Sequence, residues 1–398
     1  MLIYLHLNCC HYTAIANYLP VEATKATLER IDTYNSSVNA FAIIDQKTAL
    51  VEAQASEVRW LNGNPLGLVD DIPFTAKDLL LTKGLPTHRG SKAIIANQPW
   101  EEDAPAVACF REQGAVLLGK TTTSEFGWKG VTDSALTGIT RNPWNTELTA
   151  KGSSGGAAVA AALGMGILHL GTDGGGSSRT SAALTGVFGF KPTFGRVAGY
   201  PSAHTGTLFY IGVLVRTVTD AAVTLNVIAH PDVRDWYALP DEQQDYTVDL
   251  DRGVAGLRIA YSPNFGYADV DSEVAALVRA AVDVFAKLGA VVEQVDPGFA
   301  NPRSIFQTFW QVGAAKLLRG FSSEQRAAIE QGLQATAKEG DRITLSEYIS
   351  AQDAREALGR HSQRFHENYD LYSTCPLIKY CLSTDFTVFI LEVLHSYE

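Results

Sequence analysis

The chain has 398 residues, of which 46% are hydrophobic and 19% are charged, and its formal net charge is -11. A chain of this length and composition can bury a large core, as one sizeable domain or two. The negative charge argues against nucleic acid as a primary partner, because phosphate binding needs a basic face.

Apolar periodicity predicts helices and strands that alternate along the chain. The expected elements are a helix at 21–34, a strand at 41–44, a helix at 48–61, a strand ending at Lys77, a helix at 103–113, a strand at 115–118, a helix at 155–163 and a strand at 167–170. They continue with a helix at 216–229, a strand at 257–261, a helix at 272–288, a strand at 290–295 and a charged, mostly helical segment at 322–368. Such alternation predicts an α/β fold with a mixed central sheet flanked by helices.

Two clusters of serine and glycine flank the expected helix at 155–163 and the strand after it. Residues 152–156 read Gly-Ser-Ser-Gly-Gly, and residues 171–177 read Gly-Thr-Asp-Gly-Gly-Gly-Ser. Glycines in this number leave backbone N–H groups uncovered by side chains and free to converge on one point. A serine at the end of such a loop can attack a carbonyl while the same amides hold the developing oxyanion. The pattern therefore predicts an acyl-transfer site.

A candidate general base for this site lies upstream, at Lys77. The residues before it, 72–76, are mostly apolar, so Lys77 is expected to end a core strand. Burial disfavours the charged form of a lysine and lowers its pKa. A neutral Lys77 could take a proton from Ser177 through Ser153, in a serine–lysine variant of the catalytic triad.

Two other motif matches are read as coincidences. Residues 114–121 satisfy the phosphate-loop pattern, but that loop should follow a strand and open a helix. Here an expected helix precedes the motif, and its variable positions 115–118 are themselves an apolar strand. Residues 152–156 also satisfy G-x-S-x-G, which would make Ser154 a nucleophile at a strand-to-helix elbow. Residues 145–149 before it are too polar for the buried strand that such an elbow needs.

The ordered motifs resemble those of the amidase signature family. Besides Lys77 and the two serine–glycine clusters, the matching segments are residues 127–134, 140–144 and 189–196. The resemblance covers about residues 19–371, with a signature core at about 65–200. It implies that Ser177 is the acyl-ester nucleophile, Ser153 the bridging serine and Lys77 the general base. It also implies an oxyanion hole made by the backbone amides of Gly174, Gly175, Gly176 and Ser177.

The resemblance implies an amidase, which hydrolyses a carboxamide to a carboxylate and ammonia or an amine. Two alternatives stay open: a glutamine-hydrolysing A-type subunit of an amidotransferase, and a truncated, non-catalytic member of the family. A small-molecule amide is the expected substrate, with no cofactor, and a homodimer is left open. Cysteine and histidine spacing gives no metal-ligand pattern, so no metal is expected.

Both ends of the chain depart from the family pattern. Residues 1–18 and 372–398 are atypical segments that hold four of the five cysteines. We find no counterpart of the family's final segment after Leu371, and we expect the chain to be truncated there. Residues 1–18 do not read as a secretory signal, and the apolar run at 386–394 is shorter than the ~20 residues that span a membrane. A cytoplasmic protein with no membrane partner is therefore expected.

Overall fold

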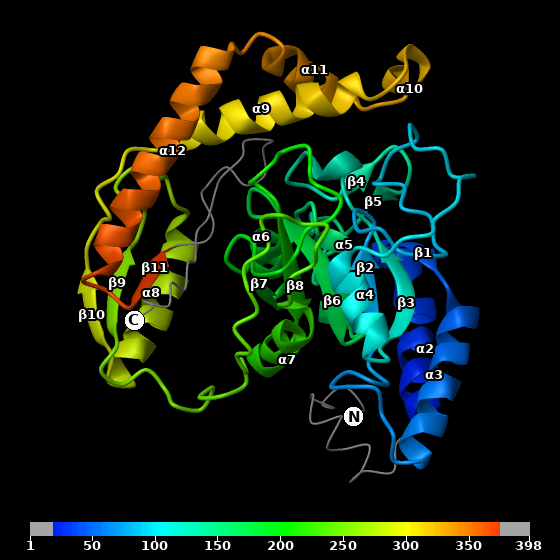
Figure 1. Cartoon of the computed structure of the whole chain (residues 1–398). Helices are drawn as coiled ribbons and strands as arrows, with labels where there is room; N and C mark the ends of the chain where they lie inside the picture. The colour runs from blue at the N-terminus through cyan, green and yellow to red at the C-terminus, as the bar shows by residue number, and fades with distance from the viewer. Residues whose placement is uncertain (1–18, 375–398) are drawn as a thin grey trace. The chain divides into compact units, whose positions relative to one another are not determined.

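The computed structural model describes residues 19–374 (Figure 1). Our expectations for residues 1–18 and 375–398 lie outside this range. The described residues form two compact units, the first holding residues 19–248 and 320–334 and the second holding residues 249–319 and 335–374. Composition allowed one domain or two, and the expected amidase domain at 19–371 is divided between these units.

The first unit contains a six-stranded mixed sheet, which confirms the expected fold class. Its strands lie in the order β1–β3–β2–β6–β8–β7. Strand β2 is parallel to both β3 and β6, whereas β8 is antiparallel to β6 and β7, and β1 is antiparallel to β3. The strand bounds are β1 Phe41–Ile44, β2 Pro73–Lys77, β3 Val116–Thr121, β6 Leu168–Asp173, β7 Phe188–Phe190 and β8 Tyr210–Val215. Two short strands, β4 Asp133–Ser134 and β5 Gly138–Ile139, pair separately.

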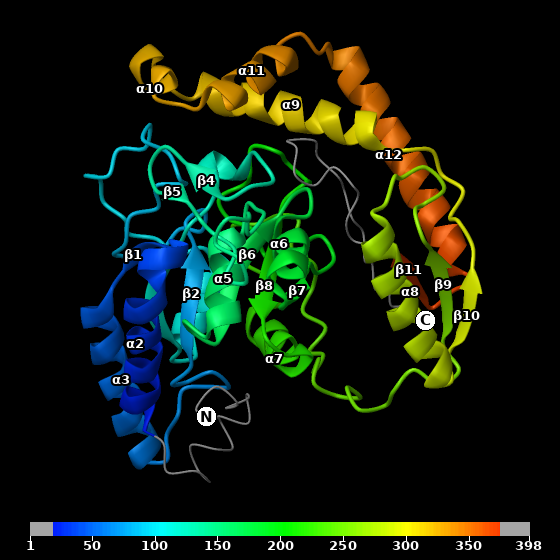
Figure 2. The ribbon, with the colours of Figure 1, turned by 180° about the vertical axis from the view of Figure 1, so that it is seen from behind.

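Helices cover both faces of this sheet (Figures 1 and 2). Helices α4 and α7 share one hydrophobic core with β2, β6 and β8, and helices α2, α3 and α5 share another with β1 and β3. The helix bounds in this unit are α2 Pro20–Val38, α3 Gln46–Leu61, α4 Pro105–Glu112, α5 Gly155–Leu163, α6 Ser177–Thr185, α7 Val218–Ile228 and α10 Ser323–Ala327, with the short η2 at Glu125–Gly127. Helix α11, Gln331–Gly340, begins in this unit.

Helix α5 is packed so tightly that its first turn needs glycine. The helix runs over Gly155–Leu163, as expected, and most of its residues are buried. A Cβ added to Gly156 would lie 2.6 Å from the backbone oxygen of Ala40, closer than real Cβ atoms come. The start of α5 can therefore approach the ends of the neighbouring strands, which places the loop before it against the end of β2.

The second unit contains a three-stranded parallel sheet in the order β10–β9–β11. Its elements are β9 Arg258–Ser262, α8 Ser272–Lys287, β10 Val291–Gln294, α9 Arg303–Arg319, the end of α11, α12 Leu345–His366 and β11 Leu371–Thr374. Aromatic side chains pack beside this sheet, with the Phe265 and Tyr372 rings 5.5 Å apart. Strand β11 begins at Leu371, so the expected domain boundary falls within a paired strand. No described helix is long and apolar enough to cross a membrane.

Candidate active site

Lys77 is the last residue of β2, and its side chain is completely buried. Its Nζ donates to Ser153 Oγ and Ser154 Oγ, each at 2.8 Å, and to Thr172 Oγ1 at 2.9 Å. Burial lowers the pKa of Lys77 well below its ordinary value, and the charge of Asp173 offsets this shift only in part. The lysine is thus placed among hydroxyl groups in a site that favours its neutral form.

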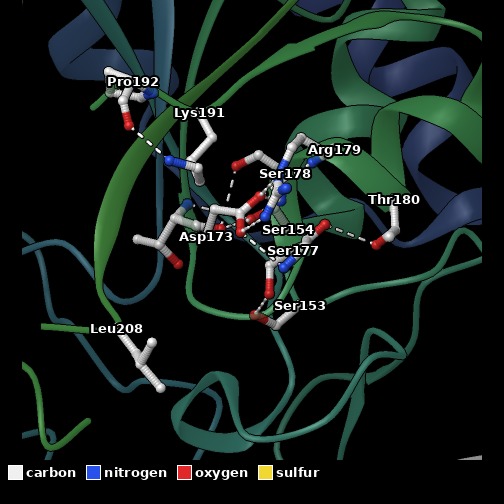
Figure 3. A network of polar contacts seen from close by, with 12 residues as sticks. Ser153, Ser154, Asp173, Ser177, Ser178, Arg179, Thr180, Lys191, Pro192 and Leu208 are labelled. Carbon is white, nitrogen blue, oxygen red and sulfur yellow. Dashed lines mark hydrogen bonds and ion pairs between the residues drawn. The ribbon is translucent and has the colours of Figure 1, made fainter. Parts of the chain in front are cut away.

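A chain of hydrogen bonds connects Lys77 to the end of the second serine–glycine cluster. Ser153 Oγ donates to Ser177 Oγ at 3.0 Å, as seen in Figure 3. Lys77 is 0% exposed, Ser153 1% and Ser177 9%, so all three residues of this hydrogen-bond chain are buried and Ser177 is the least so. The peptide bond between Gly152 and Ser153 is cis. The three residues that the sequence picked out therefore lie together in the expected order.

Asp173 ties the glycine loop to the first turn of α6. Its carboxylate accepts from the amide of Gly176 at 2.7 Å. It also accepts from the amide of Ser178 at 3.2 Å and from the Arg179 guanidinium at 3.0 and 2.8 Å (Figure 3). Burial alone would raise the pKa of Asp173, but the charge and hydrogen bonds of Arg179 and the Gly176 amide lower it to about 2. The loop end is thus held by a buried ion pair.

The hydrogen bond from Gly176 to Asp173 bears on the four amides expected to hold an oxyanion. The Gly176 amide already donates to Asp173, whereas no acceptor is found among the described residues for the amides of Gly174, Gly175 and Ser177. Of the four expected donors, the Gly176 amide is thus already engaged by Asp173.

Replacing Asp173 with asparagine should destabilise the first unit by about 3–5 kcal/mol at neutral pH, because it leaves the Arg179 charge without its buried partner. A carboxylate with a lowered pKa contributes stability above its unfolded pKa, near 4, and this contribution is lost as pH falls through the folded pKa of about 2. The difference between wild type and variant in urea unfolding should therefore shrink below about pH 4. A difference that stays constant from pH 7 to pH 3 would contradict this assignment.

Ser154 does not have the geometry of a nucleophile at an exposed elbow. It is fully buried, and its hydroxyl accepts from Lys77 and donates to the backbone oxygen of Thr172 at 2.9 Å. The Thr172 amide in turn donates to Ser154 Oγ at 3.2 Å. Ser154 therefore connects the first serine–glycine cluster to β6.

The phosphate-loop match at 114–121 also receives a structural explanation. Strand β3 runs through the motif, and Lys120 points into the protein rather than toward a ligand loop. Its Nζ donates to the backbone oxygen of Leu80 at 2.6 Å and to the hydroxyls of Thr82 and Thr87 at 3.0 and 2.8 Å. Lys120 thus fastens the loop that follows Lys77, and burial lowers its pKa to about 8.

Two residues of the site were not singled out from the sequence as site residues. Thr172 supplies the third acceptor for Lys77. Gly127 lies against the relay, the hydrogen-bond chain from Lys77 through Ser153 to Ser177, since a Cβ added to Gly127 would lie 3.2 Å from Ser153 Oγ. Thr172 stands in the second serine–glycine cluster and Gly127 opens the family-like segment 127–134, so each lay in a region already marked. Among the described residues, no group of three or more histidine, cysteine or acidic side chains is placed to hold a metal ion.

The chain is similar to known amidases over most of its length. The Amidase family model matches residues 22–376. An acylamidase from Rhodococcus erythropolis is 36% identical over 361 residues, which are 89% of this chain and 75% of that protein. The A-type subunit of the glutamyl-tRNA(Gln) amidotransferase from Chloroflexus aurantiacus is 35% identical, covering 88% of this chain and 75% of that protein. The crystal structure of a bacterial aryl acylamidase of the amidase signature family matches with a TM-score of 0.85 and 30% identity, over 92% of this chain and 78% of that chain.

Proposed function

Because this chain belongs to the amidase signature family, we propose that Ser177, Ser153 and Lys77 are the catalytic triad with which it hydrolyses amides. The chain is a hydrolase of amide carbon–nitrogen bonds, and the roles of the three residues are our proposal. The observation that supports them is the continuous hydrogen-bond chain from the buried Lys77 Nζ to Ser177 Oγ.

Acylation requires a proton to move from Ser177 to Lys77 along these hydrogen bonds. A neutral lysine amine has two N–H donors and one lone pair, so one of its three neighbouring hydroxyls must donate to it. With Ser153 in that role, its hydroxyl rotates away from donating to Ser177 and donates to Lys77, while the Ser177 hydroxyl donates to Ser153. Ser177 then passes its proton to Ser153 while Ser153 passes its own to Lys77. Ser177 Oγ then bonds to the amide carbonyl carbon, and the amides of Gly174, Gly175 and Ser177 hold the oxyanion.

Collapse of the tetrahedral intermediate breaks the carbon–nitrogen bond. The proton held by Lys77 returns through Ser153 to the leaving nitrogen, which departs as ammonia or an amine. A water molecule then attacks the acyl ester, and its proton travels the same path to Lys77 before returning to Ser177. The products are a carboxylic acid, which loses its proton to solvent to become the carboxylate, and the regenerated serine.

The alternatives differ in substrate and in partner. This chain is almost equally similar to the acylamidase and to the amidotransferase component, so identity does not choose between them. Both would use the same three residues, and only the second would need another protein to receive the ammonia. A non-catalytic role is disfavoured by the intact hydrogen-bond chain, because relaxed selection would leave no reason to keep it. We propose an amidase that acts alone on a small acyl amide, because the aryl acylamidase structure matches with a TM-score of 0.85 and an amidotransferase A-type subunit with 0.73.

The purified chain should be tested against an acyl anilide, a simple primary carboxamide and glutamine, with aniline or ammonia measured. We expect release from the anilide or the carboxamide without any added protein. If glutamine is the one substrate that releases ammonia, and if it does so only when a second protein is present, the amidotransferase role is favoured. A chain that hydrolyses none of these amides and forms no adduct with a fluorophosphonate would favour the non-catalytic alternative.

A further inference from the structure

Residues 320–334 belong to the first unit, although the residues on both sides of them belong to the second. This segment packs on the loop that follows β3. The rings of Phe321 and Phe126 lie 5.5 Å apart, and the backbone amide of Glu330 donates to the buried Glu125 carboxylate at 2.7 Å. The segment is thus joined to η2 by an aromatic contact and a partly buried hydrogen bond.

The Glu330 side chain holds the residues immediately after η2. One carboxylate oxygen accepts from the Trp128 indole N–H at 2.9 Å, and the other pairs with Lys129, which also pairs with Asp133. The Trp128 ring lies directly over Gly332, where an added Cβ would come within 2.6 Å of the indole carbon Cη2. A side chain at 332 would therefore displace the indole that Glu330 binds.

Gly127 lies between Phe126 and Trp128, which the segment contacts, and it lies close to Ser153. Phe126 and Gly127 both have left-handed backbone angles, with φ of 51° and 72°, so the chain turns sharply there. A Cβ on Gly127 would lie 3.2 Å from Ser153 Oγ and 2.9 Å from Leu79 Cδ1. Little room separates the loop from the bridging hydroxyl, and a shift of the loop would alter the space around Ser153.

We propose that Glu330 is a positioning residue for the Ser153 relay: it fixes Trp128 and Lys129, and through them Gly127 and the hydroxyl that Gly127 faces. This inference rests on the proposed function of Ser153. Partly exposed ion pairs contribute little to stability, whereas a displacement of about 1 Å at a catalytic group can cost on the order of a hundredfold in rate. Loss of Glu330 should therefore affect acylation more than folding.

The test compares Glu330→Ala and Glu330→Gln with Glu324→Ala. Glu324 is an exposed glutamate of the same segment, and its carboxylate accepts from Ser322 in its own turn, so it is a matched control. The measured quantity is the second-order rate of Ser177 labelling by a fluorophosphonate, with hydrogen exchange of residues 125–131 followed in parallel. Urea unfolding gives the folded fraction of each variant.

We expect Glu330→Ala to slow labelling about tenfold and to speed exchange of the loop, without moving the pH midpoint, since every contact of Lys77 remains. Glu330→Gln should stay within about threefold of wild type, because its amide oxygen can still accept from Trp128 and Asp133 still pairs with Lys129. Glu324→Ala should match wild type in both measurements.

Wild-type labelling and exchange in folded Glu330→Ala would overturn the proposal, as would a slower rate explained entirely by its unfolded fraction. If wild type itself takes no label, the proposed function fails. In that case hydrogen exchange alone tests whether Glu330 positions the loop at Gly127, and unchanged exchange in Glu330→Ala would overturn that proposal as well.

Discussion

Replacing Ser177 with alanine is expected to lower amide hydrolysis by a factor on the order of 10⁴ to 10⁶ and to leave the fold intact. The change removes the proposed nucleophile, and no other described hydroxyl lies at the outer end of the relay. Stability should change little, because the Ser177 hydroxyl accepts one hydrogen bond from Ser153 and alanine is a better helix former at the start of α6.

The measurement is mass spectrometry of the peptides after reaction with a fluorophosphonate. Wild type should carry the adduct on the peptide that contains Ser177, and Ser177→Ala should carry none. Ser181→Ala is the matched control, since this buried serine of the same helix has a hydroxyl without a hydrogen-bond partner in the described structure. An adduct on Ser154 would support the nucleophile-elbow reading and contradict our assignment.

The strands that carry the site were visible in the sequence, whereas one of its helices was not. The apolar run before Lys77 and the small-residue helix at 155–163 were both expected and are confirmed. Helix α6 was missed because its first five residues, Ser-Ser-Arg-Thr-Ser, form no apolar stripe. Its first turn is instead held by the Asp173 carboxylate, and Ala182 packs against α5. Such long-range support leaves no periodic signal.

In the candidate site too, residues within sequence motifs could be predicted, whereas contacts between distant segments could not. Residue types and motif order were enough to bring Lys77, Ser153 and Ser177 into one hypothesis. Gly127 lay in a segment already marked, but its neighbour's contact with Glu330 could not be predicted, because the two are about 200 residues apart in the chain and meet only through tertiary folding. Strand β8 was not predicted, although its sequence carries a local signal: Tyr210–Val215 is an apolar run, and it pairs with β6.

Replacing Lys77 with alanine should lower acylation by about 10³- to 10⁴-fold, the upper part of the range for general base catalysis. Because burial lowers the pKa of Lys77, the fraction of neutral amine grows as pH rises through that lowered pKa. The wild-type rate should rise over the same interval, and Lys77→Ala should lose both the activity and this rise. Ser153→Ala should keep a larger remnant, because Ser153 only relays the proton.

The pH profile needs one further control, since a second buried lysine has a lowered pKa. Lys120 has a pKa of about 8, and it points away from the relay toward Leu80, Thr82 and Thr87. Lys120→Met should lower stability because it leaves these acceptors without their donor, yet its folded fraction should keep the wild-type pH midpoint. A rise in rate with pH that survives Lys77→Ala but disappears in Lys120→Met would show that the titrating group is Lys120. Lys77 would then no longer be required as the base, even though its amine lies 2.8 Å from Ser153 Oγ.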